Sequence, residues 1–244
     1  APREGDRVAT ALGVPVLVER DPALPLVDVA LVLRNGAVAD PSHRDGLTRL
    51  TWRVVRMGTR GLRSEGVEER LARLGARLAM EVAPSYVRLH GTVLRRNLDA
   101  FVGLLARLVL APSFRAADLA HAVRETRSEL VAARDDDAFL AARRIRGFLF
   151  GDHPYGRTLT GTRASLRGVR RGELAAHHAA SLVRGNVVFG FSGDVVAGEA
   201  ADLVDRHFAA LPAGPAPRDG TPAPRNRRGR RVLVVDKPER TQAQ

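Results

Sequence analysis

Cysteine is absent from this chain of 244 residues, and lysine occurs only once, at Lys237. Without cysteine the chain has no disulfide framework and no thiolate chemistry, so the sequence indicates no redox compartment. No uninterrupted apolar run is long enough to cross a bilayer. Aromatic residues make up only 5% of the chain, so we expect a core built mainly from leucine, valine and alanine.

Several catalytic signatures are missing as well. The chain has no G-x-S-x-G nucleophile elbow, no phosphate-binding loop, and no His-x-x-Glu-His zinc motif or its reverse. The formal net charge is +12, but most arginines alternate with acidic residues along predicted helices, which is typical of solvated helix faces. We therefore expect no nucleic-acid binding. The one concentrated basic run follows a Pro/Gly-rich stretch and is assigned to an exposed linker: Arg225, Arg227, Arg228, Arg230 and Arg231.

Alternating apolar residues and turn signals predict strands and hairpins. A hairpin is expected over residues 8–18, a buried strand over 26–33, two short strands over 79–93, and further strands over 186–192 and 231–236. Helical periodicity predicts helices over 46–58, 65–78, 97–111, around Ser165, 173–183 and 198–211. Residues 116–150 form a longer helical region with a break near 135–137, and Ser64 is the expected cap of the second helix.

Strands joined by hairpins and grouped with long helices favour an α+β fold, in which helices pack on one face of a mainly antiparallel sheet. The Pro/Gly/Arg-rich composition from residue 212 onward marks a domain edge. We expect one α+β domain over residues 1–211. Residues 212–244 are then a linker and strand that lead toward a second half.

The helix at residues 46–58, GLTRLTWRVVRMG, carries the most informative pattern. Arg49, Trp52 and Arg53 are three or four residues apart and are expected to project from one side of it. The segment resembles the zinc helix of the insulinase/pitrilysin family, which includes the mitochondrial processing peptidases and carries His-x-x-Glu-His there. On that pattern Arg49 and Arg53 stand at the histidine positions, and Trp52 stands at the glutamate position.

The resemblance extends over almost the whole chain. VRETRSELVAARDDD resembles the family's Glu-rich helix, with Glu129 at the distance from Arg53 where the family has its third metal ligand; Ala122 departs from the usual second glutamate. GDHPYGRTLTGT and SLVRGNVVFGFSGDV resemble the family's His-Pro-Tyr-Gly turn and its helix-to-strand passage. The resemblance implies the processing-peptidase-like metallohydrolase fold, of which this chain is the N-terminal half.

The substituted motif excludes zinc catalysis at this helix. Guanidinium has no lone pair to offer a metal, so Arg49 and Arg53 cannot be ligands, and the indole of Trp52 cannot accept a proton from water. We expect no catalytic residue, no metal ligand and no cofactor in this chain. Our favoured hypothesis is that Arg49 or Arg53 pairs with Glu129, so that a fixed cation replaces the metal. The alternative is an exposed helix glutamate.

Other polar groups have simpler interpretations. His121, Glu125 and Glu129 share one helix face but are expected to be a surface row, because three ligands from one straight helix rarely converge on an ion. His177 and His178 are expected at the surface. The turn at residues 153–156 follows from its proline and glycine, and the resemblance adds Tyr155 as a possible residue of a peptide chamber.

Three functions follow from the resemblance. The first is a non-catalytic subunit that encloses a peptide together with a homologous, zinc-containing catalytic partner, as a heterodimer. The second is a structural or assembly role like that of respiratory-complex core proteins. The third is the N-terminal half of a longer chain whose zinc site lies elsewhere. The sequence leaves open the substrate, the partner and the compartment, whether bacterial cytoplasm or periplasm.

Overall fold

The computed structural model describes residues 5–218, 221–223 and 229–235. Within these residues one sheet contains six strands. They are β1 (Asp6–Ala9), β2 (Pro15–Arg20), β3 (Leu26–Leu33), β4 (Ala79–Val82), β5 (Val87–Leu94) and β6 (Val187–Gly193). The predicted strands before residue 200 are therefore confirmed, each within a few residues of its expected bounds.

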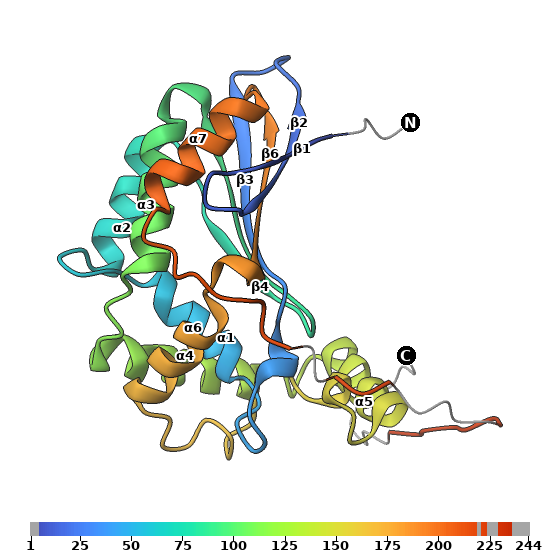
Figure 1. The fold of residues 1–244 in the computed structure, drawn as a ribbon. Helices are drawn as coiled ribbons and strands as arrows, with labels where there is room; N and C mark the ends of the chain where they lie inside the picture. The colour runs from blue at the N-terminus through green and yellow to red at the C-terminus, as the bar shows by residue number, and fades with distance from the viewer. Residues whose placement is uncertain (1–4, 219–220, 224–228, 236–244) are drawn as a thin grey trace.

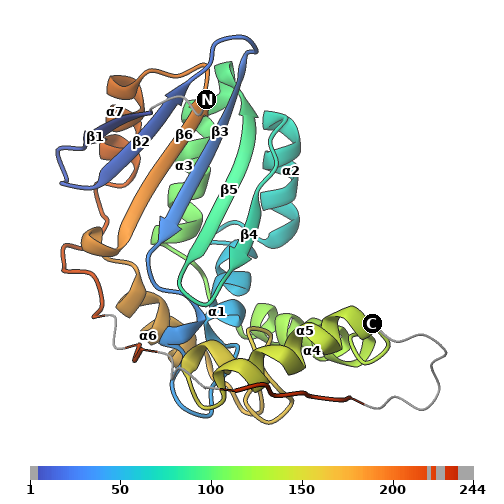
Figure 2. The same ribbon diagram turned by 90° about the vertical axis from the view of Figure 1, so that its right-hand side faces the viewer.

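The sheet has the strand order β1-β2-β6-β3-β5-β4. Of the neighbouring pairs in this sheet, only β2 and β6 run parallel. The others are antiparallel: β1 with β2, β3 with β5, β3 with β6 and β4 with β5. This confirms the predicted mainly antiparallel sheet. β6 lies between β2 and β3, so a strand from late in the chain separates two strands that are consecutive in sequence (Figure 2).

The helices form a second layer and a lower lobe. They are α1 (Leu47–Arg56), α2 (Ser64–Leu74), α3 (Leu98–Leu110), α4 (Ala116–Ala132), α5 (Asp137–Phe150), α6 (Arg171–Ser181) and α7 (Ala197–His207). Short 3-10 helices occupy Ala37–Ala39, Arg95–Asn97, Pro154–Gly156 and Arg184–Asn186. α2, α3 and α7 cover one face of the sheet, whereas α1, α4 and α6 lie beyond its end and α5 lies to one side (Figure 1).

Alternation along the strands explains why helices cover one face only. In β3, Val27, Val29, Leu31 and Leu33 are buried while the residues between them are half-buried or exposed. β5 repeats this alternation over its full length. Side chains two residues apart share a face of a strand, so the apolar residues point together toward the helices. No described helix crosses the opposite face of the sheet (Figure 2).

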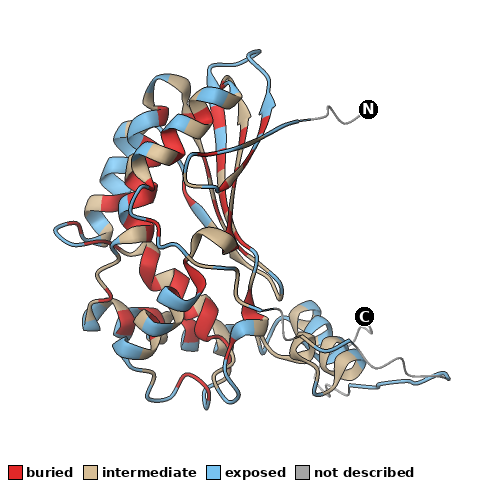
Figure 3. Cartoon of the chain, in the orientation of Figure 1, coloured by how far each residue is buried: buried red, intermediate tan, exposed pale blue. Residues whose placement is uncertain are grey.

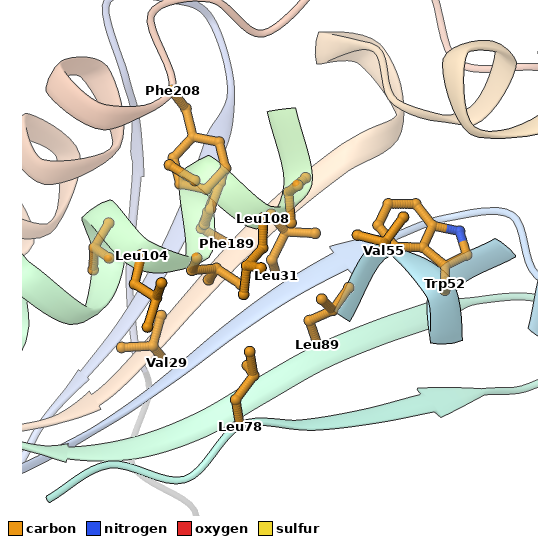
Figure 4. Packing of buried hydrophobic residues seen from close by; sticks show 14 of the residues in the cluster. Val29, Leu31, Trp52, Val55, Leu78, Leu89, Leu104, Leu108, Phe189 and Phe208 are labelled. Atoms are coloured by element: carbon orange, nitrogen blue, oxygen red, sulfur yellow. The ribbon is translucent and has the colours of Figure 1, made fainter. Parts of the chain in front are cut away.

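The core lies between the sheet and α3 and continues into the lower lobe around α1 (Figure 3). Phe189 of β6 and Phe208, just after α7, pack edge to face with ring centroids 4.7 Å apart. Leu31, Leu89 and Leu108 fill the space between sheet and α3 (Figure 4). Burial of these large side chains supplies the main favourable free energy of folding.

Some predicted boundaries are wrong for local reasons. The second helix ends at Leu74 because Gly75 takes a left-handed conformation (φ 60°) and closes the helix, so it does not reach residue 78. Ser64 is the first helical residue and makes no capping hydrogen bond; the residue before it is Arg63. The helix predicted around Ser165 is a series of turns, in which the Ser165 hydroxyl donates to the carbonyl of Asp45 at 2.7 Å.

The predicted final strand is also wrong over the residues that are described. Residues 231–235 have no strand partner, and Val232 and Val234 are more than four-fifths exposed. Arg231 lies over the ring of Phe148 in α5, 4.9 Å from its centroid. Residue 236 and most of the basic run at 225–231 lie outside the described residues. A search of the described helices finds none that combines the length and the apolar character of a membrane span.

Candidate functional site

α1 and α4 pack against each other, and their contact is made by a network of charged side chains. Arg49 Nη1 lies 2.9 Å from Oε2 of Glu129, and Arg53 Nη1 lies 2.8 Å from Oε1 of the same carboxylate. Arg49 and Arg53 are four residues apart on α1, so both reach the same side. The predicted pairing with Glu129 is therefore confirmed, and both arginines take part in it.

The network continues along α4. Arg53 also lies 3.1 Å from Glu125 through Nη2, and its Nη1 donates to the Thr126 hydroxyl at 3.3 Å. His121 lies 3.4 Å from Glu125, one helical turn away. A small polar cavity of about 360 Å³ is lined by Arg49, Arg53, His121 and Glu125, among others. We name Arg49, Arg53, Glu125 and Glu129 the α1–α4 ion cluster.

The electrostatics of Glu129 follow from its two partners. Partial burial by itself would raise the pKa of Glu129, but the hydrogen bond and charge of Arg49, followed by those of Arg53, outweigh it and lower the pKa below its ordinary value. The carboxylate is therefore ionised at neutral pH. Each arginine has several N–H donors, so one carboxylate can accept from two guanidinium groups. The arrangement holds two helices together through fixed charges.

Trp52 does not project with the two arginines, contrary to the expectation from helical spacing. Its side chain is fully buried, and its ring lies 5.2 Å from the ring of His178 in α6, between centroids. Figure 4 shows it at the end of the core, beside Val55. Trp52, which the sequence resemblance aligns with the family's glutamate, is thus a core residue, because α1 turns this side toward α6 and away from α4.

A second polar cluster, which the sequence did not predict, holds the beginning of α1. The carboxylate of Asp40 accepts hydrogen bonds from the backbone N–H groups of Gly46 and Thr48, both at 2.7 Å. The Thr48 hydroxyl donates to the same carboxylate at 2.6 Å and lies 2.8 Å from Nε2 of His177 in α6. Because that hydroxyl donates to Asp40, His177 Nε2 must carry a proton and donate to it.

Burial shifts the titration of this cluster. Burial raises the pKa of Asp40 from 3.8 to about 6, although the hydrogen bonds from Thr48 and Gly46 oppose the shift. Burial also lowers the pKa of His177, and it lowers that of His178 to about 4. His178 Nε2 lies 3.0 Å from the carbonyl of Val109 in α3. The prediction that the two histidines are surface residues is therefore wrong: both face the α1–α6 contact.

Tyr155 lies in a small aromatic group next to α5. Its ring lies 5.1 Å from His153 and 5.7 Å from Phe150, between centroids. The turn itself is formed as the sequence predicts, with the Tyr155 N–H donating to His153 Nδ1 at 3.1 Å. These contacts give Tyr155 a packing role in the turn, and its predicted part in a peptide chamber stays a prediction.

The bare face of the sheet contains a hollow of about 560 Å³. A row of residues in register crosses four strands of this face: Leu17, Gly190, Ala30 and His90. The two in the middle, Gly190 and Ala30, are very small. Among the described residues, His90 Nδ1 and Arg88 Nε are buried on this side of the sheet without a hydrogen-bond partner. Buried polar atoms normally have a hydrogen-bond partner in the protein or in ordered water.

These features define an α+β fold in which helices cover one face of a mainly antiparallel sheet. The family described as Insulinase (Peptidase family M16) matches residues 15–163, which is more than half of the chain. The chain belongs to the insulinase family, peptidase family M16, in agreement with the resemblance drawn from its sequence.

Curated relatives carry different descriptions. The chain is 22% identical over 223 residues to a protein of Helicobacter pylori named "Non-peptidase homolog YmxG", covering 91% of this chain and 52% of that protein. It is 28% identical over 205 residues to an uncharacterized zinc protease of Mycobacterium leprae, covering 81% of this chain and 44% of the relative. The chain therefore spans about half the length of the curated relatives it matches.

Solved structures share the fold. A structure described as the peptidase M16 inactive domain from Pseudomonas fluorescens matches with a TM-score of 0.85 and 25% identity over 91% of this chain and 54% of that one. The first half of the periplasmic protease PqqL from Escherichia coli matches with a TM-score of 0.81 and 16% identity, over 90% of this chain and 49% of that chain. The second likeness concerns the fold alone.

Zinc does not fit the residues of the α1–α4 ion cluster. Catalytic zinc needs three protein donors with lone pairs and an open position for water. Arg49 and Arg53 have no lone pair to donate, and they already engage the one carboxylate that both reach. The described residues include no group of three His, Cys, Asp or Glu side chains placed to hold an ion. The cluster therefore offers ion pairing between helices and no metal-activated water.

Proposed function

We propose that this chain is a non-catalytic member of peptidase family M16 that helps enclose a peptide together with a catalytic partner. The observation that carries the proposal is the α1–α4 ion cluster. Arg49 and Arg53 stand at the positions of the family's two histidines and neutralise Glu129, at the position of the third ligand. Neither arginine can bind zinc, and the two carboxylates that remain, both paired with these arginines, do not supply the three donors that catalytic zinc needs.

The relatives support a non-catalytic role without assigning one. The Helicobacter pylori relative is named a non-peptidase homolog, and the Pseudomonas fluorescens structure is described as an inactive domain. Other relatives are named zinc proteases. A family that contains both kinds is consistent with a chain that keeps the fold and has exchanged its metal-binding side chains.

The bare face of the sheet supports a role in holding a peptide. Its hollow of about 560 Å³ is large enough for a few side chains of an extended peptide. Gly190 and Ala30 leave room above the sheet, and Arg88 and His90 bring polar side chains to the lining of the hollow. In this proposal the face becomes one wall of a chamber, and a partner or a second homologous half supplies the others.

The test is a reconstitution of peptide cleavage. The purified chain is mixed with a family member from the same genome that has an intact His-x-x-Glu-His, and cleavage of a fluorogenic peptide library is followed. We expect no cleavage by the chain alone and faster cleavage by the mixture than by the partner alone. No gain over the partner would count against the chamber role, and chelator-sensitive cleavage by the chain alone would overturn the non-catalytic assignment.

A matched pair of variants connects any gain to the sheet face. Gly190→Trp fills the hollow, and Ala30→Leu fills it less severely in case the first variant folds poorly. Arg144→Glu changes an exposed residue of α5 and serves as the control. Circular dichroism checks folding of each variant. The proposal predicts that the gain falls for the two filled variants and is kept by Arg144→Glu.

A further inference from the structure

The outer surface of α3 forms a trough that the proposed function does not use. In Figure 2, α3 lies behind the middle of the sheet, with α7 behind one side and α2 behind the other. A cavity of about 720 Å³ opens along α3 and is lined by residues from all three helices. The floor is the side of α3 that faces away from the sheet, and α2 and α7 are the walls.

Small and apolar residues make up much of the floor of the trough. Ala100, Gly103 and Ala111 lie along it, with the half-buried Leu110 beside them and Leu74 of α2 at the wall. Arg107 stands between Gly103 and Ala111 on the same side of α3, and the ring of His207 from α7 lies against Gly103. Surface helices normally present charged or long polar side chains on this side. Small residues here leave a channel into which another helix can pack closely, because interaxial distance depends on the side chains at the contact.

The lining of the trough is strongly basic, on the walls and on the floor. Arg70 and Arg73 of α2, Arg107 of α3 and Arg206 of α7 all line it, and the lining contains no carboxylate. Arg73 and Arg206 pair with Glu69 and Asp99, which lie outside the lining. Arg70 and Arg107 have no carboxylate partner among the described residues, so two guanidinium groups are available to a bound molecule.

We propose that this trough binds an acidic amphipathic helix of a partner protein. Its apolar stripe would lie on Ala100, Gly103 and Leu110, and its acidic flanks would face Arg70 and Arg107. This is the helix-in-groove mode of recognition, in which apolar anchors give affinity and rim charges give orientation and specificity. α3 has 13 residues, so the trough accommodates a partner helix of about three to four turns.

Charge selects this partner over a second copy of the chain. The formal net charge of the chain is +12, so two copies repel each other, and the basic lining would meet a surface of its own sign. Nucleic acid would satisfy the arginines but would leave the apolar floor uncovered. The proposal does not depend on the peptide-chamber role, because the trough lies on the helical side, opposite the bare face of the sheet.

The test uses a designed probe. A fluorescein-labelled 18-residue peptide has leucine at helical spacing and glutamate on both flanks, and a second peptide has lysine in place of each glutamate. Fluorescence anisotropy with the full chain measures binding. We expect binding of the glutamate peptide, weakening with added salt, and no binding of the lysine peptide. Equal binding of both peptides, or of neither, would overturn the proposal.

Variants place the binding in the trough. Arg70→Glu with Arg107→Glu should weaken the glutamate peptide about tenfold or more, the range expected for interface arginines. Ala100→Trp, which fills the floor without changing charge, should weaken it as well. The control, Arg143→Glu with Arg144→Glu on α5, lowers the net charge equally and should leave binding unchanged. Loss in the control as large as in the trough double variant would show non-specific attraction and reject the site.

Two further measurements distinguish the proposed helix from two other occupants of the trough, nucleic acid and a second copy of the chain. A 20-base-pair DNA duplex competes with the peptide in the same assay, and analytical ultracentrifugation measures the oligomeric state with and without Ala100→Trp. Tighter binding of DNA than of peptide, lost in the trough double variant, would assign the patch to nucleic acid and overturn the proposal. A dimer that Ala100→Trp dissociates would assign the trough to a second copy. A monomer that binds the peptide and not the duplex supports it.

Discussion

Arg53 Nη1 lies 2.8 Å from Oε1 of Glu129, and this contact joins α1 to α4 where the family resemblance expects a metal ion between the same two helices. Arg49 occupies the other oxygen of the carboxylate at 2.9 Å. A carboxylate held between two guanidinium groups links the helices through hydrogen bonds as well as charge. The stability of the lower lobe is therefore expected to depend on Glu129.

Glu129→Gln should lower the free energy of unfolding by about 1–2 kcal/mol, because it leaves two partly buried guanidinium groups without their shared anion. Urea denaturation at pH 7 measures the change. The control is Glu69→Gln, whose partner Arg73 is as exposed as Glu69 itself; it should cost less than about 0.5 kcal/mol. Equal effects in the two variants would mean that Glu129 contributes no more to stability than an exposed ion pair does.

Arg49→His combined with Arg53→His should create a zinc site. Both arginines reach Glu129, so two histidines at these positions together with Glu129 provide three donors of the type that binds zinc. Isothermal titration should detect stoichiometric zinc, and zinc should raise the melting temperature of the double variant. Adding Glu129→Gln should remove both effects. Absence of zinc binding in a folded double variant would argue against the assignment of these positions to the family's ligands.

The free energy of unfolding should depend on pH through the titration of Asp40. Burial raises the pKa of Asp40 from 3.8 to about 6, so between these values the folded chain binds a proton more tightly than the unfolded chain. The contribution of Asp40 to the free energy of unfolding therefore falls as pH rises from about 4 to about 6 and is constant above that range. The total fall is on the order of 2–3 kcal/mol.

Asp40→Asn isolates this contribution, since His177 and His178, whose pKa values are lowered, act in the opposite direction over a similar range. As pH rises from 4 to 6, the natural chain should lose stability relative to Asp40→Asn. The difference between their free energies of unfolding should then stay constant from pH 6.5 to pH 8. A difference that is flat over the whole range would show that Asp40 titrates normally in the folded chain.

Trp52 should matter for folding and not for chemistry. Trp52→Ala should cost about 3–5 kcal/mol, because it leaves a cavity beside His178 at the end of the core. Trp52→Phe should cost less, since it keeps most of the ring. Leu17→Ala on the bare face, where Leu17 is about half exposed, should change stability by no more than about 0.5 kcal/mol. Equal costs at Trp52 and Leu17 would contradict the packing role.

The sequence predicted regular elements well wherever a periodic apolar pattern met one buried face. β3, β5 and α3 are of this kind, since each buries one continuous side. The pattern failed at residues 231–235, where an apolar run VLVV reads as a strand although no described strand lies beside it. A strand needs a partner for its backbone groups, and a local pattern does not contain that information.

The candidate site was predictable in part. The pairing of Arg49 and Arg53 with Glu129 followed from family spacing, because the fold brings α1 and α4 together whichever side chains they carry. The contact of Asp40 and Thr48 with His177 could not be found in this way. It joins three segments distant in sequence, and a pair of adjacent histidines gives no sign of which elements will cover it. Trp52 was misplaced because helical spacing alone does not say which neighbour packs on which side.

The position of β6 between β2 and β3 has a consequence for biosynthesis. When β2 and β3 leave the ribosome, the strand that must separate them has not been made. At about 5–20 residues per second, β6 follows roughly ten seconds or more later. Until then two apolar strands have open edges suited to wrong pairing. We expect the nascent chain to require a holding chaperone over this interval, so that the sheet closes around its last-made strand.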